Sequence, residues 1–296
     1  MNVFTNSVRR IRNASRHAGY RALIAYQNRD YYINSRAKKL SMLAQPDLTN
    51  ISKDFEALGV KVIQYKIDVD GFNDWLEQVQ FPSSYIDSYG GVFVEKALEH
   101  YVGASLLQMR SDDMLIDVAA AHSPWYEMAR RLYGCDGYAL DLVFPSGVHG
   151  KKIGADATHM PLPDDFATKI TLHCSYEHFE GSADVRLISE AYRILKDGGK
   201  MIILPLYMHE FYQALSSPWA GRKGLDYNGA ELVWWDYYDA PRCRFARNYS
   251  VEAFYERIVT NLNGFTLQIY YIENEKEVSP TCYLKFAALF EKPSIS

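Results

Sequence analysis

The segment from Asp156 to Tyr207 constrains the fold most, because several structural elements follow one another there in a fixed order. An aspartate ends a short strand, a proline-bracketed turn at 160–163 comes next, and a β-rich run leads to Glu177-His178. A helix closed by Gly198-Gly199 and an apolar strand complete the segment. Strands that alternate with helices indicate a parallel sheet with crossover connections. A single motif can arise by chance more easily than this series of elements in a fixed order, so the series is the more specific evidence for a fold.

The same alternation extends over most of the chain. Strands are predicted at 114–118, 137–141, 152–155, 169–174 and 200–206. Helices are predicted at 93–108, 124–133 and 184–196. A helix at 251–262, with Ser250 as its N-cap, then precedes strands at 265–273 and 282–291 that are joined by a polar turn. The chain is therefore expected to form an α/β fold with an open, mostly parallel sheet that ends in an antiparallel hairpin.

This order of parts resembles the second half of the class I S-adenosylmethionine (SAM) methyltransferase core. The resemblance covers about residues 93–291 and is most specific from Gly154 to Leu206. It implies a Rossmann-like sheet of seven strands and SAM as the cofactor. Residues 91–296 are then the methyltransferase-like core, with an aromatic insertion at 207–250. Residues 1–90 are expected to form a mostly helical N-terminal cap or lid, with a strand at 60–65.

Composition limits the class of protein. The chain has 296 residues, 48% of them hydrophobic, which suits one α/β domain with an appendage. No apolar run approaches the roughly 20 residues that span a bilayer, and the start lacks the apolar stretch of a secretory signal. The four cysteines are far apart, which argues against a zinc ribbon or disulfide framework. We expect a cytoplasmic protein without a bound metal.

Positive charge is concentrated at the N-terminus. Residues 1–40 contain nine arginines and lysines against one aspartate, whereas the whole chain has a net charge of −4. Such an arm can steer an anionic partner or contact a membrane surface, or it can be a solvated helix that docks on the acidic body. The chain has no Asn-Pro-Pro-Tyr-type motif after the fourth strand. Together with the acidic remainder of the chain, this argues against a nucleic-acid substrate.

The turn after the first strand departs from the family pattern. The resemblance implies that Asp117 precedes three glycines, but Ala119, Ala121 and Ser123 occupy their positions. Asp117, Ala119 and Ala121 are accordingly expected to contact the cofactor. Alanine adds a methyl group and disfavours a positive φ, so the loop must be shaped differently or bind weakly.

Acidic residues follow the next two strands. Asp141 is placed to accept hydrogen bonds from both ribose hydroxyls, a role that NAD-binding folds also give to an acid there. Its alternative role is to cap a turn. The resemblance assigns the adenine to Asp156 and the backbone amide of Ala157, and it places His173 against the adenosine. Asp156 together with the Met160–Pro163 turn favours a methyltransferase over a dehydrogenase.

The segment that follows the fourth strand and the aromatic insertion contain the residues expected to bind the methyl acceptor. His178 is expected to orient the acceptor or to act as a base, and His209 is the second catalytic candidate. Glu177, Tyr207 and Arg247 are expected to bind the acceptor, although Glu177 can instead brace the loop. The many aromatic residues of the insertion suit a platform for sugars or planar groups, or a packed flap or dimer surface.

These features predict SAM-dependent methyl transfer to a small polar acceptor, such as a sugar hydroxyl of a glycan or its precursor. One alternative is a methyltransferase-like domain that has lost its cofactor and serves as a binding or assembly subunit. A second alternative is an NAD-dependent enzyme, which the missing Gly-x-Gly-x-x-Gly motif and the terminal hairpin disfavour. The oligomeric state is left open.

Overall fold

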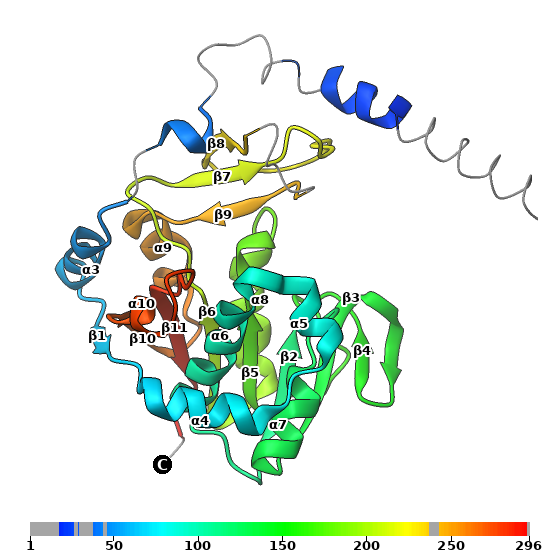
Figure 1. Ribbon diagram of the computed structural model, residues 1–296, viewed down its shortest axis with the longest axis vertical. Coiled ribbons are helices and arrows are strands. Elements are labelled where there is room, and N and C mark those ends of the chain that lie inside the picture. The colour runs from blue at the N-terminus through cyan, green and yellow to red at the C-terminus, as the bar shows by residue number, and fades with distance from the viewer. Residues whose placement is uncertain (1–17, 27–28, 30–37, 44–45, 237–242, 295–296) are drawn as a thin grey trace, which may run out of the picture.

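The computed structural model describes residues 18–26, 29, 38–43, 46–236 and 243–294 (Figure 1). Of the predicted helical segment before residue 45, residues 18–26 form a helix and Leu40–Met42 form the 3₁₀ helix η1. Most of the basic arm lies outside the described residues.

The main sheet has eight strands in the order β1-β10-β11-β6-β5-β2-β3-β4. Their bounds are β1 Val62–Tyr65, β2 Met114–Val118, β3 Asp136–His149, β4 Lys152–Gly154, β5 Ala167–His173, β6 Leu195–Leu204, β10 Thr266–Ile272 and β11 Phe286–Glu291. β11 runs antiparallel to both β10 and β6, and the other pairings follow the parallel pattern. The predicted Rossmann-like sheet with a terminal hairpin is confirmed, and β1 adds an eighth strand at the edge.

Alternating side chains of the strands build two cores on opposite faces of the sheet. Leu115, Ile202 and Leu204 pack on one face with α4 (Val69–Val79), α5 (Ser83–Tyr89), α6 (Phe93–Leu107) and α7 (Trp125–Tyr133). Ile116, Met201 and Ile203 pack on the other face with α3 (Leu48–Ala57), α8 (Ala183–Ile194) and α9 (Val251–Arg257). Figure 1 shows this three-layer arrangement. Ser250 caps α9, as predicted, by accepting a hydrogen bond from the Ala253 amide at 3.2 Å.

Two parts of the sheet differ from the sequence expectation. β1 belongs to the N-terminal third yet pairs with β10, and Phe55 of α3 packs edge-on against Phe254 of α9 at 5.6 Å between ring centroids. Residues 48–89 thus share the cores of the main body. β3 continues past Asp141 into a hairpin, so β4 lies between residues 139–141 and 146–149 and no helix separates β3 from β4.

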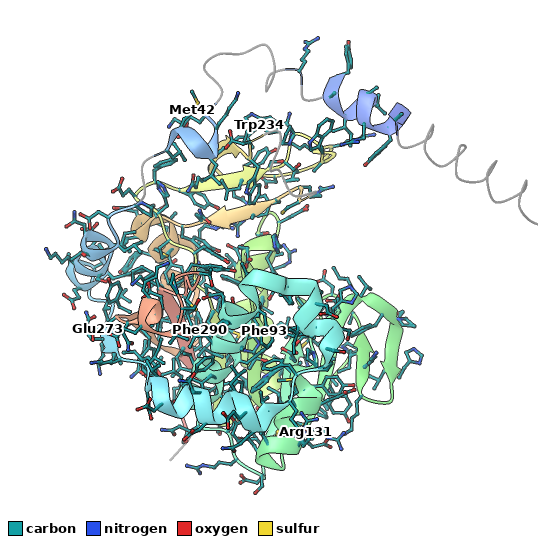
Figure 2. The ribbon with its side chains drawn as sticks, in the orientation of Figure 1. Met42, Phe93, Arg131, Trp234, Glu273 and Phe290 are labelled. Atoms are coloured by element: carbon teal, nitrogen blue, oxygen red, sulfur yellow. The ribbon has the colours of Figure 1, made fainter. Side chains whose placement is uncertain are left out.

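The insertion forms a small second sheet in the order β8-β7-β9, made of β7 Gln213–Ser216, β8 Glu231–Trp234 and β9 Ala246–Asn248. It stands at one end of the main sheet (Figure 1). Residues 38–43 pack against it: Lys39 bridges to Trp234, and the Lys38 ammonium lies 2.7 Å from Glu231. Figure 2 shows Met42 and Trp234 close to each other at this end. Residues 38–43 and the small sheet of the insertion are therefore in direct contact.

Candidate active site

Two cavities open beside the carboxyl ends of the central strands, where open α/β sheets hold their ligands. The strand-end cavity, of about 710 Å³, is bounded by Ala119 after β2, Asp141 of β3, Asp156 after β4 and the segment 174–180 after β5. The insertion cavity, of about 910 Å³, lies between that same segment, the small sheet and residues 40–48. Cys174 and His178 line both cavities, so the two spaces meet at these side chains.

The alanine-containing turn after β2 keeps the strand-end cavity open. Ala119 has a φ of 58°, the left-handed conformation that glycine adopts without strain. The Ala120 amide donates to the Leu140 carbonyl at 3.1 Å, and the Ala121 amide donates to Asp141 Oδ2 at 3.0 Å. The turn thus has a glycine-like backbone path although its residues carry methyl groups, and it lines the cavity at Ala119.

Asp141 and Asp156 both line the strand-end cavity and both also stabilise local turns. Asp141 accepts hydrogen bonds from Ala121 and, through Oδ1, from the Val143 amide at 2.9 Å. Asp156 accepts from the Thr158 amide at 2.8 Å and is otherwise exposed. A carboxylate oxygen can accept two hydrogen bonds, so each carboxylate keeps acceptor capacity for a ligand. Ala157 lines the same wall.

Three of the residues expected to bind the cofactor lie outside the lining of this cavity. Asp117 is buried below the turn and accepts a hydrogen bond from the Thr171 hydroxyl at 3.0 Å. The His173 ring packs edge-on against His100 at 4.2 Å between centroids, and its Nδ1 lies 3.6 Å from Asp117. Ala121 faces a different hollow, beside α5. Asp117 and His173 thus lie buried beside the strand ends, and Ala121 is part of the turn itself.

Glu177 and His178, in the short helix η3 (Tyr176–His178), form a charged pair at the junction of the cavities. His178 Nδ1 lies 2.7 Å from the Phe245 carbonyl and therefore carries a proton, while Nε2 lies 3.6 Å from Glu177 Oε1. Burial lowers the pKa of His178, but the contacts with the Cys243 thiol, the Glu177 carboxylate and the Phe245 carbonyl outweigh burial and raise it to about 9. Burial raises the pKa of Glu177. Its Oε2 is buried and has no hydrogen-bond partner among the described residues.

Cys174 connects this pair with Tyr207. The Cys174 Sγ lies 3.5 Å from Glu177 Oε1 and 3.4 Å from the Tyr207 hydroxyl. Burial raises the pKa of the Cys174 thiol to about 12, so it is a neutral thiol near pH 7. Tyr207 and Glu177 line the insertion cavity, where they were expected to contact an acceptor.

His209 also lines the insertion cavity. Its Nδ1 accepts a hydrogen bond from the Phe211 amide at 3.4 Å, which leaves the proton of the neutral ring on Nε2. Burial lowers the pKa of His209. A neutral ring in this tautomer donates a hydrogen bond rather than accepting a proton.

Arg247 is placed differently from the expectation. It lines neither cavity and is fully buried, with an ion pair to Asp184 and a hydrogen bond to the Gly181 carbonyl at 2.7 Å. Arg257 binds the other oxygen of Asp184 at 2.7 Å. Because these contacts hold β9 against the start of α8, Arg247 serves in packing rather than in the expected contact with the acceptor.

Among the described residues, no cluster of three or more histidines, cysteines, aspartates or glutamates could hold a metal ion. In that same part of the chain, no helix has the length and apolar character that crossing a membrane requires.

The chain is similar to one family model and to several solved structures. Residues 117–203 match the family model described as a methyltransferase domain. No curated protein matches the chain in sequence. Among solved structures, the chain is similar to a 1,6-didemethyltoxoflavin-N1-methyltransferase of Burkholderia thailandensis with bound 1,6-didemethyltoxoflavin and S-adenosylhomocysteine, at 12% identity and a TM-score of 0.48, over 89% of this chain and 98% of that one. It is also similar to a SAM-dependent methyltransferase of Methanosarcina mazei, at 12% identity and a TM-score of 0.42, over 63% of this chain and 95% of that one.

The matched segment is similar to a methyltransferase domain, and the order of the strands is that of the Rossmann-like methyltransferase fold. For a chain that contains such a segment, SAM is the cofactor to be tested at this site. The strand-end cavity fits this cofactor, because its volume lies in the range of about 300–1,000 Å³ for small-molecule sites and small side chains at Ala119, Ala155 and Ala157 leave it open. The two carboxylates supply acceptors for hydroxyl and amino groups.

Several residues of the site were not found from the sequence. Cys174 lies in the predicted rim, but only the fold shows that it lines both cavities. Arg186 and Arg244 line the strand-end cavity from α8 and from the insertion. Gln213 and Leu215 line the insertion cavity, and the strand β7 that carries them has no distinctive pattern within an aromatic-rich segment.

Proposed function

We propose that this protein transfers the methyl group of SAM to a small acceptor that binds in the insertion cavity. One observation carries the proposal: Cys174 and His178 line both cavities, so a donor in one space and an acceptor in the other meet there. Methyl transfer is an in-line displacement at the sulfonium carbon, and bringing the two partners together supplies much of the rate.

The strand-end cavity would hold the cofactor through residues at the ends of three strands, β2, β3 and β4. Asp141 would accept hydrogen bonds from the ribose hydroxyls, and Asp156 with Ala157 would bind the adenine. Ala119 would let the cofactor approach the backbone of the turn. In this arrangement Asp117, Ala121 and His173 act indirectly, because they shape the turn and its support.

The Glu177–His178 pair would handle the proton of the acceptor. A hydroxyl or amine nucleophile loses a proton when it gains a methyl group. With both ring nitrogens of His178 protonated near pH 7, the basic member of the pair is Glu177, whose raised pKa and unpartnered Oε2 suit proton acceptance. His178 would stabilise the carboxylate and donate a hydrogen bond. His209, as an Nε2–H donor, would orient the acceptor beside Tyr207.

The acceptor is proposed to be a small molecule with a polar nucleophilic group, for which a sugar hydroxyl of a glycan or its precursor is one form. Glu177, His178 and Tyr207 provide a polar end next to the donor. We place the enzyme in the cytoplasm as part of this proposal, because its four cysteines are free and fit a reducing compartment.

Calorimetric titration of the purified chain with SAM, S-adenosylhomocysteine and NADH tests the proposal. Saturable binding of the first two, with no heat from NADH and a large loss of affinity in Asp156→Ala, is the expected result. Asp156 is exposed, so this variant leaves the core intact. If neither SAM nor S-adenosylhomocysteine gave a binding signal, the result would instead support a binding or assembly subunit without a cofactor.

A further inference from the structure

Gln213 is a buried amide that finds no partner in the described protein. It lies on β7, is fully buried, and lines the insertion cavity. Neither its amide oxygen nor its amide nitrogen has a hydrogen-bond partner among the described residues. Buried polar side chains are nearly always paired, because an unpaired donor or acceptor loses its bonds to water without replacement. An occupant of the cavity is the natural partner for this amide.

The wall around Gln213 is mostly apolar, and its polar exception is Asn248, which pairs with Gln213 across β7 and β9 and lines the same cavity. Alternate residues of a strand share a face, so Gln213 and Leu215 both face the insertion cavity, and Leu215 pairs with Ala246 of β9. Leu40, Leu43 and Trp235 line the same cavity. A sugar ring carries hydroxyls around its whole edge, and several of them would lose their hydrogen bonds against these side chains. A flat, mostly apolar molecule with one polar edge satisfies both Gln213 and the wall.

Each charged group of the cavity has a partner within the described protein. Glu177 pairs with His178, and Glu275 pairs with Lys285 at 2.5 Å. Lys276 donates to the carbonyls of Pro280 and Cys282. Gln213 is uncharged and presents one acceptor beside one donor in a plane. The complement of that pattern is an uncharged group with a donor beside an acceptor, as in a ring –CO–NH– unit.

We propose that Gln213 determines acceptor specificity by pairing with the lactam edge of a planar, uncharged heterocycle. This inference rests on the proposed function and names the chemical class of its acceptor. The amide of Gln213 donates to the lactam carbonyl and accepts from the lactam N–H, while the apolar wall covers the ring faces. The nucleophilic atom of the acceptor then lies toward Glu177 and His178.

The test uses a matched set of probes on the full chain saturated with S-adenosylhomocysteine. 2-Quinolone carries the lactam edge, N-methyl-2-quinolone lacks its N–H, and methyl glucoside represents a sugar acceptor. Wild-type protein is expected to bind 2-quinolone about tenfold more tightly than N-methyl-2-quinolone, which is about the difference that one hydrogen bond makes. Gln213→Leu and Gln213→Met are expected to lose this preference. Equal binding of the two quinolones, no binding of 2-quinolone, or tighter binding of methyl glucoside would each overturn the inference.

A second readout needs no acceptor. Because the free protein buries an unpaired amide, Gln213→Leu is expected to raise its melting temperature by a few degrees, whereas the same change at the exposed Gln64 on β1 is expected to leave it unchanged. A fall in melting temperature for both Gln213 variants would show that the amide is bonded in the free protein and would contradict the inference.

Binding of S-adenosylhomocysteine distinguishes a failure of the proposed function from a failure of the acceptor class. Its loss in wild-type protein would refute the proposed function, while its retention without a lactam preference would refute the acceptor class alone.

Discussion

Asp141 Oδ2 accepts a hydrogen bond from the backbone amide of Ala121 at 3.0 Å, so the acid expected to bind ribose also fixes the turn that should carry glycines. The bond joins the ends of two neighbouring parallel strands, β2 and β3. It gives the alanine-containing turn a defined shape, and under the proposed function it would link cofactor binding to the stability of the loop.

Replacing Asp141 should therefore affect folding and binding together. Asp141→Ala removes the acceptor for the amides of Ala121 and Val143 and is expected to destabilise the protein by about 1–3 kcal/mol. It should also lower the affinity for S-adenosylhomocysteine by more than about tenfold. Chemical denaturation and calorimetry measure the two effects. Unchanged stability would show that the turn does not depend on this side chain.

Replacing Ala119 with glycine should stabilise the protein relative to the same replacement at Ala121. Its φ of 58° disfavours a side chain, so Ala119→Gly relieves strain that offsets the added flexibility of the unfolded chain. Ala121 does not have a positive φ, and Ala121→Gly brings flexibility without relief. We expect Ala119→Gly to be more stable than Ala121→Gly by about 1 kcal/mol in urea denaturation. The reverse order would contradict the left-handed conformation at Ala119.

The Glu177–His178 pair predicts a loss of stability at high pH. The folded-state pKa of His178 is raised from about 6.5 to about 9, so its stabilising contribution is complete below pH 6.5 and disappears as the pH rises through 9. Since the imidazole is half exposed, we expect at most about 1 kcal/mol. His178→Gln should flatten the unfolding free energy between pH 7 and 9.5, whereas the exposed control His159→Gln should retain the slope. A wild-type profile without that slope would argue against the ion pair.

Arg247 should matter for stability rather than for recognition. Arg247→Met leaves Asp184 with Arg257 as its remaining cation, and breaking such a buried pair costs about 3 kcal/mol. The exposed pair of Arg244 with Glu180 should contribute less than about 1 kcal/mol, which makes Arg244→Met the matched control in denaturation. Affinity of the folded Arg247→Met protein for S-adenosylhomocysteine should stay within about twofold of wild type. A small loss of stability would show that the buried pair is weak.

Much of the fold could be predicted because periodicity and caps are local signals. β2, α7 and α8 lie within two residues of their predicted bounds. β11 begins at Phe286 rather than 282, because α10 (Glu275–Val278) and the segment after it occupy the expected turn. The hairpin after Asp141 was not predicted, since pairing between β3 and β4 depends on contacts across strands rather than on local pattern.

The site was only partly predictable for a related reason. Ala119, Asp141, Asp156 and Ala157 follow strands, and parallel strands bring their ends to one edge whatever the details of packing. The direction of a side chain within a crowded layer depends on its neighbours. Arg247 therefore points inward and pairs with Asp184, and Asp117 and His173 are buried beside the strand ends. Gln213 could be recognised as a candidate site residue only from its burial and its missing hydrogen-bond partners, which the sequence does not show.

A crystal structure of the full chain with S-adenosylhomocysteine tests the central claim most directly. We predict the ribose at Asp141, the adenine at Asp156 and Ala157, and the sulfur facing Cys174 and His178 with an open path to the insertion cavity. A ligand bound elsewhere, or a sulfur that faces away from Cys174 and His178, would contradict the account.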